Sequence, residues 1–115
     1  MVAIEVTKDM TDKVYEALEV AKTTGKLSKG ANETTKAIEK GIAKLVVIAK
    51  DVSPPEITMH IPLLSEEKDV LCLEVPSKEE LGGATGIEVG TAAVTIIQEG
   101  EAKSLIADLI KKLKK

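Results

Sequence analysis

One segment constrains the fold more than any other. Residues 45–49 read Leu-Val-Val-Ile-Ala, five apolar side chains in succession. A strand with a single covered face alternates apolar and polar side chains, whereas an uninterrupted apolar run is typical of a central strand buried on both faces. The sheet that contains this strand therefore needs cover on both sides, which favours a layered α/β domain with the sheet between helices.

The rest of the chain supplies helical and extended patterns in alternation, as such a domain requires. The glycines Gly82, Gly83 and Gly86 indicate a mobile loop. Separately, Ile38 and Ile42 lie four residues apart, a helical spacing suited to packing both side chains on the sheet. The predicted elements, in chain order, are a helix to about Thr24 capped by Asp9 or Thr11, an edge strand over 26–29, a helix from an Asn32 N-cap to about Lys40, the strand over 45–49, a helix to about Lys68 with Pro62 as a possible break, a strand over 71–75, a short helix after a Ser77–Glu80 capping box, a strand over 92–97, and a last helix with Leu105, Ile106, Leu109, Ile110 and Leu113 on one face.

Length and composition agree with one intracellular domain over residues 1–115. With 115 residues, 43 % of them apolar, the chain can build a core without a disulfide or a structural metal. The single Cys72 suits a reducing cytoplasm, and we expect no metal and no cofactor. No run of 18 apolar residues is present, and the first residues do not resemble a signal peptide. We therefore expect a cytoplasmic protein with no membrane partner.

The distribution of charge is more informative than its total. The net charge is −3, yet residues 26–50 carry six Lys and two acidic residues, a net charge of +4. Such a basic segment can attract an anionic partner, or it can be an ordinary solvated Lys-rich face. The chain has no Arg, and Tyr15 is its only aromatic residue, so it cannot stack single-stranded bases to any extent. If it binds RNA, it must read shape, base edges and phosphates.

The basic segment contains a group of polar residues at a predicted helix start. A turn at Gly30 leads into Asn32 and Glu33, and Lys36 and Lys40 follow on the same helical face as Glu33. An exposed helix N-terminus offers free N–H donors and a positive potential to a phosphate. The plainer interpretation is an N-cap, a first-turn acid and a salt bridge between Glu33 and Lys36.

Several longer stretches carry a more specific pattern. They read Lys29-Gly30-Ala31-Asn32-Glu33-x-Thr35-Lys36, Gly41-Ile42-Ala43-Lys44 followed by the apolar strand, Asp51-Val52-x-Pro54-Pro55-Glu56-Ile57, His60-Ile61-Pro62-Leu63-Leu64-x-Glu66-Glu67-Lys68, Val75-Pro76-Ser77-Lys78-x-Glu80-Leu81-Gly82 and Gly86-Ile87-Glu88-Val89. Over roughly residues 10–110 the chain thereby resembles the archaeal ribosomal protein L-seven-Ae family. The resemblance implies a three-layer α-β-α sandwich with a four-stranded mixed sheet. It also implies binding to kink-turns, in which duplex RNA bends sharply at a bulge beside tandem sheared G·A pairs.

The resemblance also implies which residues contact RNA. Asn32, Glu33 and Lys36 would read guanine edges in the sheared pairs, and nearby lysines would hold the backbones. For Ile57 the alternative is core packing, for Lys78 it is a solvated helix position, and for the loop 87–89 it is simple strand entry. The full set of expected RNA-binding residues is Lys26, Lys29, Gly30, Asn32, Glu33, Lys36, Lys40, Ile57, Lys78, Ile87, Glu88 and Val89.

The implied partners are those of a ribonucleoprotein component that is monomeric without RNA. They are ribosomal RNA of the large subunit, the box C/D and H/ACA guide RNAs with their proteins, and ribonuclease P. The chain departs from the family pattern at Glu79, where a basic residue is common, and at Lys29 and Lys40, where Arg is often found. These departures bear on phosphate affinity, because Lys lacks the guanidinium fork of Arg.

Two other classes of function remain open from the residues alone. An enzyme would have to use His60, the only His, or Cys72, which lies within an apolar run and favours an inert core thiol. The glycines at 82, 83 and 86 lack the spacing of a nucleotide-binding loop. The expectation is therefore that the protein is not an enzyme. The third class is a protein-interaction module that uses the acidic C-terminal half and has no RNA specificity of its own.

Overall fold

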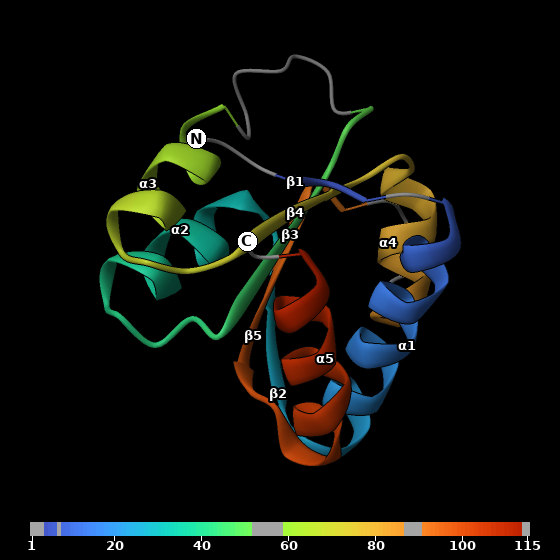
Figure 1. The fold of residues 1–115 in the computed structure, drawn as a ribbon. Coiled ribbons are helices and arrows are strands. Elements are labelled where there is room, and N and C mark those ends of the chain that lie inside the picture. The colour runs from blue at the N-terminus through green and yellow to red at the C-terminus, as the bar shows by residue number, and fades with distance from the viewer. Residues whose placement is uncertain (1–3, 7, 52–58, 87–90, 114–115) are drawn as a thin grey trace.

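A mixed β-sheet with helices on both faces forms the domain (Figure 1). The structure is a computed structural model that describes residues 4–6, 8–51, 59–86 and 91–113. Its elements are β1 (Ile4–Glu5), α1 (Lys8–Thr24), β2 (Lys26–Lys29), α2 (Ala31–Glu39), β3 (Leu45–Ala49), α3 (His60–Glu67), β4 (Cys72–Val75), α4 (Lys78–Ala84), β5 (Ala93–Gln98), a 3-10 turn η2 (Gly100–Ala102) and α5 (Lys103–Leu113).

The apolar segment β3 lies in the middle of the sheet, whose strand order is β1-β4-β3-β5-β2. Strands β1, β4 and β3 are parallel to one another, whereas β5 runs antiparallel to both β3 and β2. The expected α/β class and the mixed four-stranded sheet are confirmed, and β2 is an edge strand as predicted. The two-residue β1 extends the sheet beside β4, and the sequence patterns did not indicate it.

Alternate side chains of β3 enter two different cores, as a strand covered on both faces requires. Leu45, Val47 and Ala49 join a cluster with buried residues of α1, α4 and α5. Val46 and Ile48 join a second cluster with residues of α2 and α3. Figure 1 shows the same division, with α2 and α3 on one side of the sheet and α1, α4 and α5 on the other. The predicted three-layer arrangement is therefore present.

Some predicted boundaries are wrong at the helix starts. Helix α1 already begins at Lys8, so Asp9 and Thr11 lie within the helix and not at its N-cap position. Pro62 does not break α3, because it is the third residue of that helix, where no helical acceptor is needed for its missing N–H. The Ser77 cap is confirmed, since its Oγ accepts a hydrogen bond from the Glu80 N–H at 3.2 Å.

Two predictions about packing are also corrected. Gly82 and Gly83 belong to α4 and do not form a loop, because that helix continues to Ala84 and buries Gly82 against the core. Ile42 is 41 % exposed and does not pack beside the fully buried Ile38. Helix α2 ends at Glu39, and Gly41 turns the chain with a φ of 74°, so the helical spacing no longer applies at Ile42. Among the described helices, none has the length and apolarity needed to cross a membrane.

Candidate nucleic-acid interface

The start of α2 is built around Gly30 and not around the predicted N-cap, Asn32. Gly30 itself is the N-cap, with φ 99° and ψ 155°, a conformation that is essentially restricted to glycine. Its N–H donates to the Ala93 carbonyl at 2.7 Å, and its own carbonyl accepts from the Thr34 N–H at 3.0 Å. Asn32 is the second helical residue and is exposed, so its amide is not used in capping the helix.

Glu33 and Lys36 form a surface ion pair one helical turn apart. The Glu33 Oε1 and Lys36 Nζ atoms are 3.7 Å apart, and the two side chains are 58 % and 62 % exposed. An exposed pair of this kind contributes on the order of 0.3–0.5 kcal/mol to stability, so a ligand can separate it at little cost. The structure thus places the expected acid and ammonium group together, and it also contains the plainer salt bridge.

Hydrogen bonds connect the start of α2 to the end of β3 and the start of α4. The Ala49 N–H donates to the Ala92 carbonyl at 2.9 Å, next to the residue that receives the Gly30 N–H. Beyond β3, Asp51 Oδ1 accepts from the Lys78 N–H at 2.8 Å, and the Lys78 carbonyl accepts from the Thr91 N–H at 3.1 Å. These contacts hold Gly30, Asp51 and Lys78 at the end of the sheet where β2, β3 and β4 terminate. We call this region, together with the exposed first turns of α2, the α2 edge.

A second set of contacts fixes α2 to α3. The Thr35 hydroxyl donates to the Ala31 carbonyl at 2.8 Å, and its oxygen also lies 2.8 Å from His60 Nε2. Because the single hydroxyl proton is used toward Ala31, the geometry favours an Nε2–H that donates to Thr35. His60 is therefore a positioning residue for the first turn of α2. The sequence reasoning missed this role, and it also missed Asp51, for which the polar position directly after a buried strand was the available signal.

The remaining expected residues divide into three groups. Lys29, the last residue of β2, pairs with Val94 and lies close to the α2 edge. Lys26 pairs with Gln98 at the other end of β2, and Lys40 is the C-cap of α2, so both lie away from the start of α2. Ile57 and the loop Ile87, Glu88 and Val89 lie outside the described residues. The α2 edge thus combines Lys29, Gly30, Asn32, Glu33, Lys36 and Lys78.

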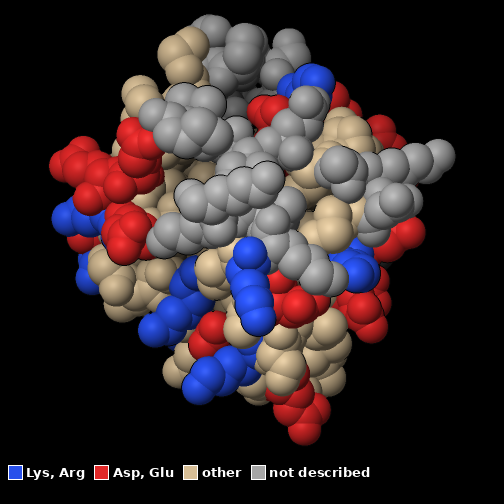
Figure 2. Space-filling model, in the orientation of Figure 1, with Lys and Arg blue, Asp and Glu red and all other residues tan. Residues whose placement is uncertain are grey.

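Charge does not gather in one continuous field on the surface. The six lysines of residues 26–50 are all exposed, but they are spread over β2, α2 and the two ends of β3. Figure 2 shows Lys and acidic side chains interspersed over one face of the molecule. Recognition at the α2 edge would therefore depend on local geometry more than on a long-range positive potential.

The sequence predicts an inert core thiol at Cys72 and no metal site. Cys72 is 5 % exposed, and burial raises the pKa of its thiol to about 12, as expected for an inert core residue. No group of three or more His, Cys, Asp or Glu side chains that could hold a metal ion is found among the described residues.

Comparison with known proteins gives two matches. Residues 12–106 match the model of the Ribosomal protein L7Ae/L30e/S12e/Gadd45 family. Among solved structures, the fold is similar to that of a Giardia lamblia 15.5kD RNA binding protein, with a TM-score of 0.90 and 28 % sequence identity. That alignment covers 95 % of this chain and 91 % of the Giardia lamblia chain.

Proposed function

Because the chain belongs to the Ribosomal protein L7Ae/L30e/S12e/Gadd45 family, we propose that it is an RNA-binding component of ribonucleoproteins that recognises and stabilises kink-turns. Binding would occur at the α2 edge. The structural neighbour from Giardia lamblia is itself an RNA-binding protein, which supports this class of function. We further propose that the RNA partners include large-subunit ribosomal RNA, box C/D and H/ACA guide RNAs and the RNA of ribonuclease P, as in archaeal particles.

The observation that carries the proposal is the exposed start of α2. A sheared G·A pair leaves the Watson–Crick edge of guanine unpaired, with N–H donors beside the O6 acceptor. The carboxylate of Glu33 can accept from those donors, while Asn32 or Lys36 can donate to O6. Glu33 and Lys36 already lie one turn apart and exposed, so the acid and the ammonium group can face one base edge. A uniformly basic patch would lack the acceptor.

The bend of a kink-turn brings two phosphate backbones together, and lysines can hold them. Lys29 and Lys78 flank the start of α2 at the same sheet edge. We propose that they contact phosphates and that Ile57 and the segment 87–89 complete the surface against the bulge. Each Lys acts as a point charge without a guanidinium fork, so we expect binding to weaken steeply as salt rises. The role is to fix a bent RNA, not to catalyse a reaction.

A titration against two RNAs tests the proposal directly. One RNA carries a bulge followed by tandem G·A pairs, and the other is a duplex of the same length and composition with the bulge removed and the G·A pairs replaced by Watson–Crick pairs. Calorimetry or gel shift should show strong preference for the first RNA, with one protein bound per site. Equal affinity for both RNAs would reject kink-turn recognition while leaving the family and the fold unaffected.

The central residue is Glu33. We expect Glu33→Ala to weaken kink-turn binding by about 1–3 kcal/mol, because the guanine donors would lose their acceptor. Glu39→Ala is the matched control, since Glu39 is an exposed acid at the other end of α2 and its loss changes the net charge equally. A folded Glu33→Ala protein that binds like the control would exclude Glu33 as a reader.

One observation favours the alternative, a protein-interaction module without RNA specificity. Met59 and Leu63, before and within α3, are 61 % and 59 % exposed, and large apolar side chains are costly to leave in water. This alternative predicts that a protein partner binds equally well with and without RNA and that Glu33→Ala has no effect. Surface plasmon resonance with the RNA-free protein distinguishes the two functions.

A further inference from the structure

A pocket of about 460 Å³ has a lining that includes none of the residues assigned above to RNA. It opens where the parallel strands β1, β4 and β3 end, between the beginning of α1 and α4. Ligand sites of α/β sheets commonly occur outside the carboxyl ends of parallel strands. The lining residues are Val6, Thr11, Asp12, Lys50, Glu74, Val75, Pro76 and Glu80.

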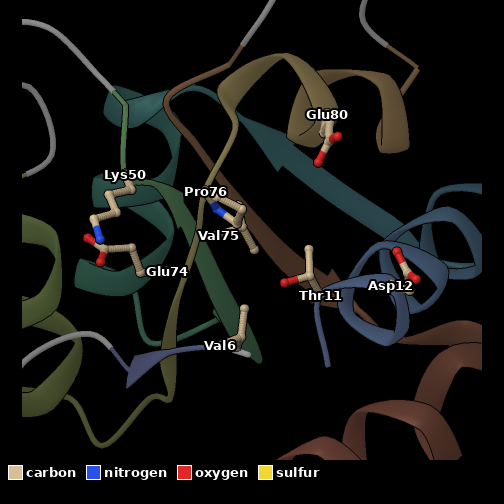
Figure 3. Close-up of a pocket in the computed structure, with 8 residues that line it drawn as sticks. All are labelled: Val6, Thr11, Asp12, Lys50, Glu74, Val75, Pro76 and Glu80. Carbon is tan, nitrogen blue, oxygen red and sulfur yellow. The ribbon is translucent and has the colours of Figure 1, made fainter. Parts of the chain in front are cut away.

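The lining divides into apolar walls and two charged sides. Figure 3 shows Lys50 and Glu74 on one side, with their side chains toward each other, and Asp12 and Glu80 on the opposite side. The apolar residues Val6, Val75 and Pro76 lie between these sides. Lys50 is the one cation among the described lining residues, against three carboxylates, so the lining has a net charge of −2.

The side of the pocket formed by Asp12 and Glu80 has a negative potential, and this potential affects the pKa of the neighbouring Tyr15. The Tyr15 hydroxyl donates to Glu80 Oε1 at 3.4 Å. Burial, the largest cause, and the charges of Glu80, Asp51 and Asp12 together raise the pKa of Tyr15 from 10.0 to about 12. A group that becomes an anion is disfavoured here, and a cation is favoured for the same reason.

We propose that this pocket receives an arginine side chain from a basic segment of a partner protein. The aliphatic stem of the arginine would lie on Val6, Val75 and Pro76, and its guanidinium would lie between Asp12 and Glu80. A planar guanidinium has five N–H donors, which can engage two carboxylates at once, whereas an ammonium is a compact point charge. The negative lining disfavours a phosphate backbone, so the occupant is a protein and not RNA.

The pocket and the α2 edge are separate in composition but adjacent in the fold. The Lys50 N–H donates to the Val75 carbonyl at 2.8 Å, and the next residue, Asp51, holds the start of α4. A basic segment anchored in the pocket could therefore continue toward RNA held at the α2 edge. The inference does not depend on the proposed function, because the pocket is formed by the protein alone.

The test uses the full chain without RNA and a labelled hexa-arginine peptide as the probe. Fluorescence anisotropy should show that Asp12→Asn/Glu80→Gln weakens binding about tenfold, because both guanidinium acceptors lose their charge. The matched control is Glu19→Gln/Glu67→Gln, which changes the net charge equally at exposed residues of α1 and α3 that do not line the pocket. We expect the control to change affinity by less than about twofold. Equal losses in the two variants would overturn the proposal and leave only general attraction to an acidic surface.

Two further measurements test whether arginine is preferred over other cations and whether it binds in this pocket. Hexalysine and spermidine should bind more weakly than hexa-arginine, and equal affinities would overturn the assignment of arginine. In a nuclear magnetic resonance titration with N-acetyl-arginine amide, the amide signals of Val6, Thr11 and Val75 should move together and saturate. Shifts spread over the acidic residues of α3 would contradict the pocket as the site. The same spectra show whether each variant is folded.

Discussion

The two helical layers that cover the sheet differ in what they contribute. On the α1, α4 and α5 side, 17 of the described residues form one buried apolar cluster, whereas the α2 and α3 side has 8. Among the described residues, most apolar burial, and with it most of the hydrophobic stabilisation, therefore belongs to the first layer. The proposed RNA-reading residues belong to the second, thinner layer.

The thinner layer also tolerates imperfect local chemistry. Its helix α2 begins at a glycine in a conformation that other residues avoid, and this layer buries the Thr34 hydroxyl without a hydrogen-bond partner in the described structure. Such features cost free energy, and they are found where function constrains the chain. This domain therefore tolerates an unfavourable helix start on one face because the other face supplies most of the described core.

The largest expected effect tests the first layer. Leu18 of α1 is fully buried in the larger cluster, so Leu18→Ala should lower the free energy of unfolding by about 2–5 kcal/mol. Urea denaturation followed by circular dichroism measures this loss. The RNA affinity of the folded protein should remain unchanged. A folded Leu18→Ala protein with weakened RNA binding would show that the two layers are not separable.

A pair of glycine substitutions compares the two layers directly. Gly30→Ala should destabilise the protein by about 1–3 kcal/mol, because the φ of 99° strains any residue with a Cβ even though the space around it is open. Gly83→Ala in α4 meets no nearby atom at an ordinary φ, and should stabilise by about 0.4–1 kcal/mol. Thermal unfolding of both variants checks the signs. If Gly30→Ala were neutral, the helix start would not be conformationally constrained.

Thr34 offers a smaller test of the second layer. Thr34→Val replaces the unpaired buried hydroxyl with a methyl group of similar shape, and should stabilise the protein by about 1 kcal/mol. Thr95→Val is the control with the opposite expectation, since the Thr95 hydroxyl donates to the Leu45 carbonyl at 3.1 Å and its loss should destabilise. Chemical denaturation of both variants measures the two signs. Loss of stability in Thr34→Val would mean that its hydroxyl has a partner in solution.

The smallest effect concerns pH and the first layer. Tyr15 has a pKa raised to about 12 from the ordinary 10.0, chiefly by burial and then by Glu80. Its contribution to stability is therefore complete below pH 10 and is lost as pH rises toward 12, because the unfolded chain releases the proton first. Tyr15 is the only tyrosine, so its ultraviolet titration needs no assignment. Glu80→Gln should lower the midpoint, whereas Glu67→Gln should leave it unchanged.

Much of the fold was predictable from the sequence, because strong periodic patterns determine it. The run over 45–49 required a two-sided sheet, the Ser77 cap matched its signature, and the family resemblance is confirmed by the match over residues 12–106. The helix starts were less predictable. Asn32 is a good N-cap by residue type, but the hydrogen bond from Gly30 to Ala93 places the start two residues earlier.

The RNA-binding role of the candidate residues stays a prediction, whereas their local geometry can be compared with the structure. The helical spacing correctly paired Glu33 with Lys36, since both lie on one helix. It could not show that Lys26 and Lys40 lie away from the start of α2, because that depends on how β2 and α2 run across the sheet. The contacts of Asp51 with Lys78 and of His60 with Thr35 join residues 25 or more positions apart, which no local pattern encodes.

The single cysteine, Cys72, provides a natural probe for local opening of the layer formed by α2 and α3. Cys72 belongs to the smaller cluster beneath α2 and α3, and its thiol has a pKa near 12 because of burial. A disulfide reagent can react with it only after that layer opens, so the labelling rate of native protein reports the opening free energy of the layer that holds the proposed reading residues. Bound RNA that clamps α2 should slow the labelling, and without any engineered probe the degree of slowing would measure how firmly the ligand holds the helix in place.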